Sequence, residues 1–232
     1  ELISTVSHEL RTPVTSIRGA LGLLEAGVLG ELPVKAMDFV KVAHRNSQRL
    51  LSLVNDILDM DKLLSGKMTL HLDTIDLNAL IQDAISVNAP YATSYKVQYQ
   101  YMPSDNLPQI LGDYQRLMQV MANLMSNAAK FSVPEKPVDI RVQQVEKMMR
   151  IEVQDYGCGM PSAFQARVFE AFSQADSAST RKQGGTGLGL NITKKIVEAM
   201  GGEIGFSSVV DVGSQFWFTI PIVDNHRDDI VN

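Results

Sequence analysis

Two runs of apolar residues near the start of the chain repeat with the spacing of a coiled-coil seam. In the first run the apolar residues lie alternately four and three positions apart: Leu10, Val14, Ile17, Leu21 and Leu24, with Ile3 one heptad earlier. The second run keeps this alternation, with Ser47 and Asp61 at two of its positions: Val40, Ala43, Leu50, Val54, Ile57 and Leu64. Such a repeat places one apolar stripe on each of two helices.

The segment from Gly27 to Pro33 has the glycine stop and proline restart of a helical hairpin. Two helices alone bury too little surface, and heptads need partner helices. The sequence therefore predicts a hairpin over residues 1–66 that pairs with a second copy as a dimeric four-helix bundle. A hairpin packed on its own downstream domain remains the alternative.

The periodicity changes after Ser65-Gly66-Lys67, where helical and strand patterns begin to alternate. We expect strands at 69–75, 96–101, 138–145, 150–155, 203–207 and 214–220, and helices at 77–87, 113–130 and 188–200. This order predicts an α+β chain whose second part is a two-layer α/β sandwich with a mixed sheet. The expected divisions are a linker and first strand at 67–76, the second domain at 77–224 and a polar tail at 225–232.

Composition excludes several classes of protein. The net charge of −5 over 232 residues argues against nucleic-acid binding by bulk charge. There is no run of 18 apolar residues and no signal peptide, so we expect no membrane contact within this chain. The single cysteine, Cys158, suits a reducing compartment. Because the chain starts at Glu1 without a methionine, we interpret it as a fragment of a longer protein. We expect the fragment to be cytoplasmic, while the full-length parent can be anchored in the inner membrane.

The helix predicted after Asp113 carries an unusual polar stripe: Arg116, Gln119, Asn123, Asn127 and Lys130. A merely solvated face is usually rich in Glu and Lys, and asparagine is a poor helix former. Asparagine oxygens can bind Mg²⁺, which needs few protein ligands when phosphates and water supply the rest. Lys130 adds a positive charge for phosphate. The stripe therefore indicates a site for a magnesium nucleotide.

Two glycine-rich loops complete this pattern. Asp155-Tyr-Gly157-Cys-Gly159 follows a predicted strand, where a carboxylate can accept a hydrogen bond from an exocyclic amine and the glycines let a flat base approach. Gly184-Gly185-Thr-Gly187-Leu-Gly189 leads into a helix, whose N-terminus offers N–H donors to phosphate. Either loop alone is weak evidence, since each is also an ordinary turn.

Taken together, these motifs resemble the catalytic core of two-component sensor histidine kinases. Ser7-His8-Glu9-Leu10-Arg11-Thr12-Pro13 resembles the H box, Asn123 to Phe131 the N box, Asp155 to Gly159 the first G box, Phe169 to Phe172 the F box and Gly185 to Gly189 the second G box. All stand in the family's order and cover essentially the whole chain. The stretch from Phe172 to Gly189 is most similar to the hybrid subclass. The sequence departs from the usual pattern at Tyr156, where Asn or Thr is more common.

The resemblance implies roles for individual residues. It places the phosphoacceptor at His8, which lies one residue after the seam position Ser7 and is thus turned about 100° away from it. Glu9 would orient or deprotonate the imidazole, and Thr12, on the same face one turn later, would position water for dephosphorylating a partner. Residues that would contact ATP are Asn123, Asn127, Lys130, Asp155, Gly157, Gly159, Phe172, Gly185, Thr186, Gly187, Leu188 and Gly189, with Asn127 also contacting Mg²⁺.

The function implied is that of an ATP-dependent protein-histidine kinase. It would phosphorylate His8, pass the phosphoryl group to an aspartate of a response-regulator receiver domain, and in some states remove it again. Its expected partners are a second copy of the chain and that receiver. Two alternatives stay open: a dimeric scaffold that binds nucleotide without phosphotransfer, and another ATPase of the gyrase, mismatch-repair or heat-shock kind.

Overall fold

The computed structural model describes residues 2–174 and 186–223. It divides into two compact units, one up to Met68 and the other from Thr69 onward. None of the helices in the described ranges is long and apolar enough to span a bilayer.

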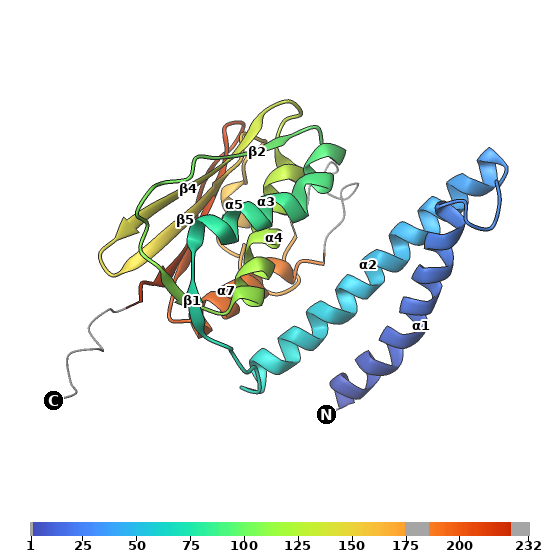
Figure 1. Cartoon of the computed structure of the whole chain (residues 1–232), viewed down its shortest axis with the longest axis horizontal. Coiled ribbons are helices and arrows are strands. Elements are labelled where there is room, and N and C mark those ends of the chain that lie inside the picture. The colour runs from blue at the N-terminus through green and yellow to red at the C-terminus, as the bar shows by residue number, and fades with distance from the viewer. Residues whose placement is uncertain (1, 175–185, 224–232) are drawn as a thin grey trace. The chain divides into compact units, whose positions relative to one another are not determined.

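The first unit is a hairpin of two antiparallel helices, α1 (Leu2–Glu25) and α2 (Val34–Leu64), packed side by side (Figure 1). Helix α1 continues through Pro13. The turn contains two glycines with positive φ, Gly27 at +70° and Gly30 at +103°, a backbone region that other residues rarely adopt. The predicted hairpin is confirmed.

The apolar seam of this hairpin is only partly covered. Among the described side chains of the hairpin, the seam residues Val14, Ser47 and Val54 and the neighbouring Leu58 are buried, at 3–8% exposure. The alternate seam residues Leu10, Ile17, Leu50 and Ile57 stay 37–53% exposed. Each helix therefore keeps an apolar stripe that the single chain does not bury, as expected for helices that pair with further helices.

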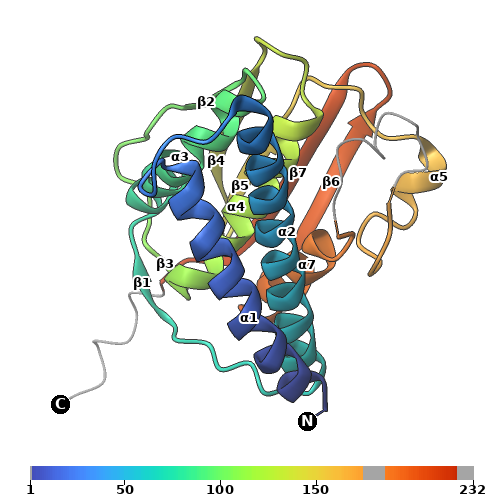
Figure 2. The same cartoon turned by 90° about the vertical axis from the view of Figure 1, so that its right-hand side faces the viewer.

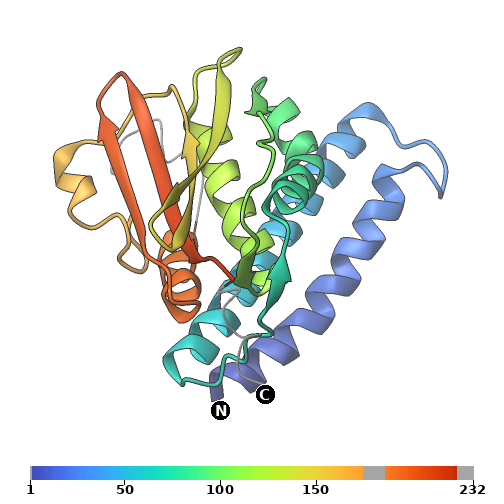
Figure 3. The ribbon, with the colours of Figure 1, turned by 60° about the vertical axis from the view of Figure 1, so that its left-hand side comes forward.

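The main part of the second unit, as far as it is described, is a five-stranded sheet with the helices α3 (Leu77–Ser94), α4 (Tyr114–Phe131) and α7 (Gly189–Ala199) on one face (Figure 3). Its strand order is β2-β4-β5-β7-β6, from β2 (Gln98–Tyr101), β4 (Pro137–Val145), β5 (Met148–Gln154), β6 (Ile204–Val209) and β7 (Gly213–Pro221). β2 and β4 are parallel, and the other neighbours are antiparallel. The expected α+β fold with a mixed sheet is confirmed.

Some elements differ from the sequence-based expectation. The first strand is only β1 (Asp73–Ile75), because it pairs with a strand of equal length that the sequence did not predict, β3 (Ile110–Gly112). A short helix, α5 (Ser162–Gln165), was also not predicted. It lies next to β6, where Gln165 donates to the backbone carbonyl of Ser208 at 3.2 Å (Figure 2).

Helix α4 runs through the centre of this unit. Asp113 caps its start by accepting the backbone N–H of Arg116 at 3.1 Å. Seven residues of α4 are buried against the sheet and the neighbouring helices: Leu117, Val120, Met121, Leu124, Met125, Ala128 and Ala129. The opposite side of the helix therefore presents the polar stripe.

Candidate functional site

Asn123 stands where α4 meets the start of α7. Its Nδ2 donates to the hydroxyl of Thr193 at 2.7 Å. Gly189 approaches it so closely that a Cβ there would lie 2.5 Å from Oδ1 of Asn123. The structure thus brings the N box and the second G box together, as the sequence requires of one site.

Asn127 and Lys130 follow along the same stripe, both half-buried. Within the described part of the chain, the Asn127 amide has no hydrogen-bond partner. Nζ of Lys130 lies 4.6 Å from the centroid of the Phe131 ring. An unpaired amide and an ammonium group one helical turn apart can serve a cation and a phosphate.

The end of α4 contacts the first glycine loop directly. Ser132 and Gly157 form an antiparallel bridge. A Cβ at Gly157 would collide with the backbone carbonyl of Phe131. The next glycine, Gly159, has a φ of +63°, and a Cβ there would collide with the backbone carbonyl of Val209. Glycine is needed at both positions because backbone packs on backbone.

Asp155 is a buried carboxylate at the end of β5, only 4% exposed. Its Oδ1 accepts the backbone N–H of Gly157 at 3.0 Å and that of Ser214 at 3.2 Å. Burial raises its pKa to about 6, although these two hydrogen bonds act in the opposite direction. Its other oxygen, Oδ2, takes no part in these two bonds and is the atom suited to accept an exocyclic amine.

Tyr156 turns its hydroxyl toward β4, where it donates to Oδ2 of Asp139 at 2.6 Å. Asp139 alternates with the buried residues Val138 and Ile140, so it belongs to the sheet face opposite the helices. The hydrogen bond to this carboxylate raises the pKa of Tyr156. The tyrosine hydroxyl is thereby held away from the α4 side of the loop.

The second glycine loop packs against the F box. Gly187 has a φ of +72°, and a Cβ there would lie 2.8 Å from the carbonyl carbon of Phe172. Phe172 itself has a φ of +62° and is 71% exposed. Thr186 accepts the backbone N–H of Leu188 at 3.1 Å, just before α7. Gly185 lies outside the described residues.

Phe169 anchors the start of the F box. Its ring contacts Phe206 and Phe216 edge-on, with centroids 5.8 and 6.4 Å away. Its backbone carbonyl accepts Nδ2 of Asn191, on α7, at 2.7 Å. The F box is therefore tied to α7, the helix whose Thr193 accepts the hydrogen bond from Asn123 on α4.

The H-box residues lie on the first unit. His8, Glu9 and Thr12 all belong to α1, and Glu9 and Thr12 are exposed to solvent. Arg11, in the same motif, donates to Oδ1 of Asn55 on α2 at 2.8 Å. Arg11 thus links the motif to α2, while Glu9 and Thr12 remain accessible to solvent.

The residues of the second unit fit a magnesium nucleotide. Glycines line both loops where side chains would collide with backbone, a buried carboxylate keeps an oxygen outside its structural bonds, and two asparagines supply hard oxygen donors. In the described ranges, no three His, Cys, Asp or Glu residues gather in a metal-binding group. The donor set therefore suits a cation that a nucleotide brings with it.

Comparison with known proteins agrees with this geometry. Residues 1–66 match the His Kinase A (phospho-acceptor) domain, and residues 112–224 match the histidine kinase-, DNA gyrase B- and HSP90-like ATPase family. The chain belongs to the histidine kinase family. This is the family that the sequence motifs resemble.

Relatives extend over nearly the whole chain. The sensor protein GacS of Pseudomonas syringae pv. syringae is 37% identical over 98% of this chain, and the signal transduction histidine-protein kinase BarA of Escherichia coli is 34% identical over 95% of it. The chain spans only about a quarter of each of these relatives. A crystal structure of full-length ShkA in complex with AMPPNP superposes with a TM-score of 0.78, at 33% identity, over 96% of this chain and 46% of that one.

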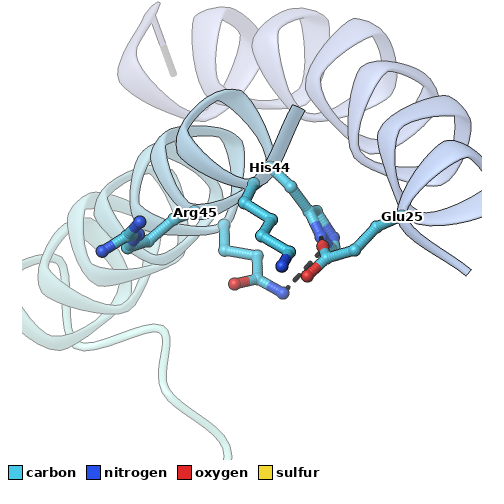
Figure 4. Close-up of a pocket in the computed structure, with 5 residues that line it drawn as sticks. Glu25, His44 and Arg45 are labelled. Carbon is cyan, nitrogen blue, oxygen red and sulfur yellow. Dashed lines mark hydrogen bonds and ion pairs between the residues drawn. The ribbon is translucent and has the colours of Figure 1, made fainter. Parts of the chain in front are cut away.

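The hairpin holds a polar pocket of about 370 Å³ that the motifs do not include (Figure 4). Glu25, at the end of α1, contacts Nδ1 of His44 on α2 at 2.5 Å, and Lys41, Arg45 and Gln48 complete the lining. A Cβ at Gly22 would lie 3.7 Å from the imidazole. This pair ties the turn end of α1 to α2.

Three partners of the site residues were not predicted from the sequence: Thr193, Ser214 and Asp139. Each lies far along the chain from the residue that it contacts, by 70, 59 and 17 positions. Their residue types are ordinary for a helix or strand, so only the packing of α4, α7 and the sheet could reveal them.

Proposed function

We propose that this chain is the core of an ATP-dependent protein-histidine kinase, with its second unit binding Mg·ATP and His8 accepting the phosphoryl group. One observation carries the proposal: the motifs that contain Asn123, Asp155 and Gly187 lie next to one another. Gly189 lies against Asn123, and Gly157 lies against the end of α4. The family match to a phospho-acceptor domain supports the role of the hairpin.

In the proposed reaction, a ring nitrogen of His8 attacks the γ-phosphorus of ATP. The bond from that phosphorus to the β–γ bridging oxygen breaks, and ADP leaves with the electron pair. Glu9 accepts or orients the proton on the other ring nitrogen. Most of the acceleration in such transfers comes from positioning and charge neutralisation.

Asn127 would hold Mg²⁺, with Asn123 beside it, and Lys130 would bind phosphate. The cation would supply charge neutralisation for the transferring phosphoryl group. Oδ2 of Asp155 would accept the exocyclic amine of adenine. The glycines of both loops would let the base and the phosphates approach the backbone.

The phosphoryl group would then pass to an aspartate of a receiver domain, and the active form would be a homodimer. The exposed seam residues Leu10, Ile17, Leu50 and Ile57 support the dimer. The resemblance to sensor kinases supports the receiver, and Thr12 would contribute to its dephosphorylation.

The deciding experiment is incubation of the full chain with γ-labelled ATP and Mg²⁺, followed by acid and alkali treatment of the labelled protein. We expect a label that survives alkali and is lost in acid, as phosphohistidine does. His8→Gln should abolish the label and leave nucleotide affinity unchanged, because His8 belongs to the other unit. Undiminished alkali-stable label in that variant would place the acceptor elsewhere.

A further inference from the structure

Thr193 is the fifth residue of α7 and lies outside the nucleotide-binding motifs. It is buried, with 2% of its surface exposed, and its hydroxyl accepts Nδ2 of Asn123 at 2.7 Å. This bond crosses from α7 to α4, which pack against each other. The side chain of Thr193 thus forms a hydrogen bond between α7 and the neighbouring helix α4.

The Asn123 amide is confined on its other side by Gly189. A Cβ at Gly189 would lie 2.5 Å from Oδ1 of Asn123 and 3.1 Å from Nδ2. Thr193 takes one of the two Nδ2 hydrogens and so fixes which way the amide faces, with Oδ1 as its acceptor atom for a ligand. An amide oxygen accepts but cannot donate, so it can serve a cation or a water molecule and cannot bind a phosphate oxygen.

We propose that Thr193 is a positioning residue that orients Asn123 so that its Oδ1 serves the magnesium ion of bound ATP, directly or through one water. A residue that hydrogen-bonds a metal-ligating side chain fixes the orientation of that side chain, and its loss typically weakens metal affinity. The proposal rests on the proposed function of the second unit and gives Asn123 a defined cation-binding atom beside Asn127.

The test compares Thr193→Val, which removes the acceptor at nearly constant volume, with Thr193→Ser, which retains it. Binding of the non-hydrolysable analogue AMPPNP to the full chain is measured by calorimetry, once with Mg²⁺ and once with EDTA. We expect Thr193→Val to weaken binding about tenfold with Mg²⁺ and to leave binding in EDTA unchanged. Thr193→Ser should bind like the wild type under both conditions.

Two results would overturn the assignment. One is wild-type affinity of Thr193→Val with Mg²⁺; the other is an equal loss with Mg²⁺ and EDTA, which would show a structural role. If circular dichroism shows that Thr193→Val does not fold, Asn123→Ala decides: a loss confined to Mg²⁺ supports the proposal and a loss in both conditions refutes it. Failure of the wild type to bind AMPPNP with Mg²⁺ would instead refute the proposed function.

Discussion

Asp155 is a carboxylate whose charged form the fold disfavours. Burial raises its pKa from 3.8 to about 6, so the folded chain holds this proton more tightly than the unfolded chain does. The free energy of unfolding therefore falls as the pH rises through the window between these two values. Above it, the ionised carboxylate destabilises the fold by roughly 3 kcal/mol. A residue retained at such a cost fits a role in ligand binding.

Asp155→Asn should therefore stabilise the protein while abolishing nucleotide binding. The amide cannot ionise, and its oxygen can still accept the N–H groups of Gly157 and Ser214. We expect the free energy of unfolding to rise by about 1–3 kcal/mol at pH 7.5 and to match the wild type near pH 4. Urea unfolding at both pH values measures this. If the variant were less stable than the wild type at pH 7.5, the fold would stabilise the ionised carboxylate of Asp155, contrary to this argument.

Gly187→Ala should lower both nucleotide affinity and His8 phosphorylation by roughly tenfold, since a left-handed φ costs an alanine 1–2 kcal/mol. The new methyl group would also press on the backbone of Phe172 and displace the F box. Filter binding of labelled nucleotide and the autophosphorylation rate give the two readouts.

Gly19→Ala is the matched control for this substitution. Gly19 lies within α1, and a Cβ there would have no atom within 4 Å. It should leave nucleotide affinity unchanged and stabilise the hairpin by about 0.5–1 kcal/mol. If both variants kept the nucleotide affinity of the wild type, Gly187 would have no role in the proposed phosphate binding.

The identity of single site residues was easier to predict than their partners. Asn123, Gly187 and Gly189 stand in motifs whose spacing is visible in the sequence, and the structure brings them to one place. Thr193 gives no such signal, because a threonine in an amphipathic helix has no expected partner. Its contact with Asn123 depends on how α4 and α7 cross, which is a tertiary property.

At the scale of elements, the apolar seam of each hairpin helix contains both buried and exposed residues. Val14 and Val54 are buried within the pair, whereas Ile17 and Ile57 remain exposed at 53% and 37%. Ile57→Asp should dissociate the proposed dimer, because a charge in an apolar four-helix core loses its hydration without a partner. Light scattering coupled to size-exclusion chromatography would report the mass.

Val42→Asp is the control for the dimer experiment. Val42 is 49% exposed on the same helix but lies off the heptad seam. This variant should keep the mass of the wild type. Dissociation by both substitutions, or by neither, would contradict the seam as the dimer interface.

Thr12→Ala should separate kinase from phosphatase activity. Thr12 is exposed on α1 one turn after His8, where a hydroxyl can orient water toward a docked receiver. Alanine improves helix propensity by a few tenths of a kcal/mol, so the helix should persist. We expect normal His8 labelling with slower loss of phosphate from the receiver. A parallel fall in labelling would mean that Thr12 shapes the helix around His8.

The prediction of elements succeeded where one segment carries its own periodicity and failed where packing decides. Helix α3 was expected to end at Val87 but continues to Ser94, through Pro90, because Ala92 in its last turns is buried at 4% exposure. Tertiary burial there outweighs the helix-breaking tendency of proline. β3 was missed because a three-residue strand is too short to show alternation.

At the scale of the whole molecule, the proposed phosphoacceptor and the proposed nucleotide site lie on different units. His8 lies on a hairpin that ends before Met68, and every described residue of the proposed nucleotide site lies beyond Thr69. The second unit has its own buried core, including Leu80, Met121 and Phe218. The second unit should therefore fold and bind nucleotide when expressed by itself, and the hairpin should fold as the proposed dimer.

Residues 69–232, produced alone, should bind Mg·AMPPNP with the affinity of the full chain, and should phosphorylate a separate hairpin of residues 1–68 when the two are mixed. The rate should fall by roughly 100-fold at about 10 µM of each fragment, because the covalent link supplies an effective concentration on the order of 1 mM. Labelled ATP and gel electrophoresis would follow the transfer. A hairpin carrying His8→Gln should stay unlabelled, since no other histidine of α1 or α2 stands in the acceptor motif. Failure of the second fragment to bind nucleotide would show that the hairpin completes the nucleotide site, and the division of labour between the units would be wrong.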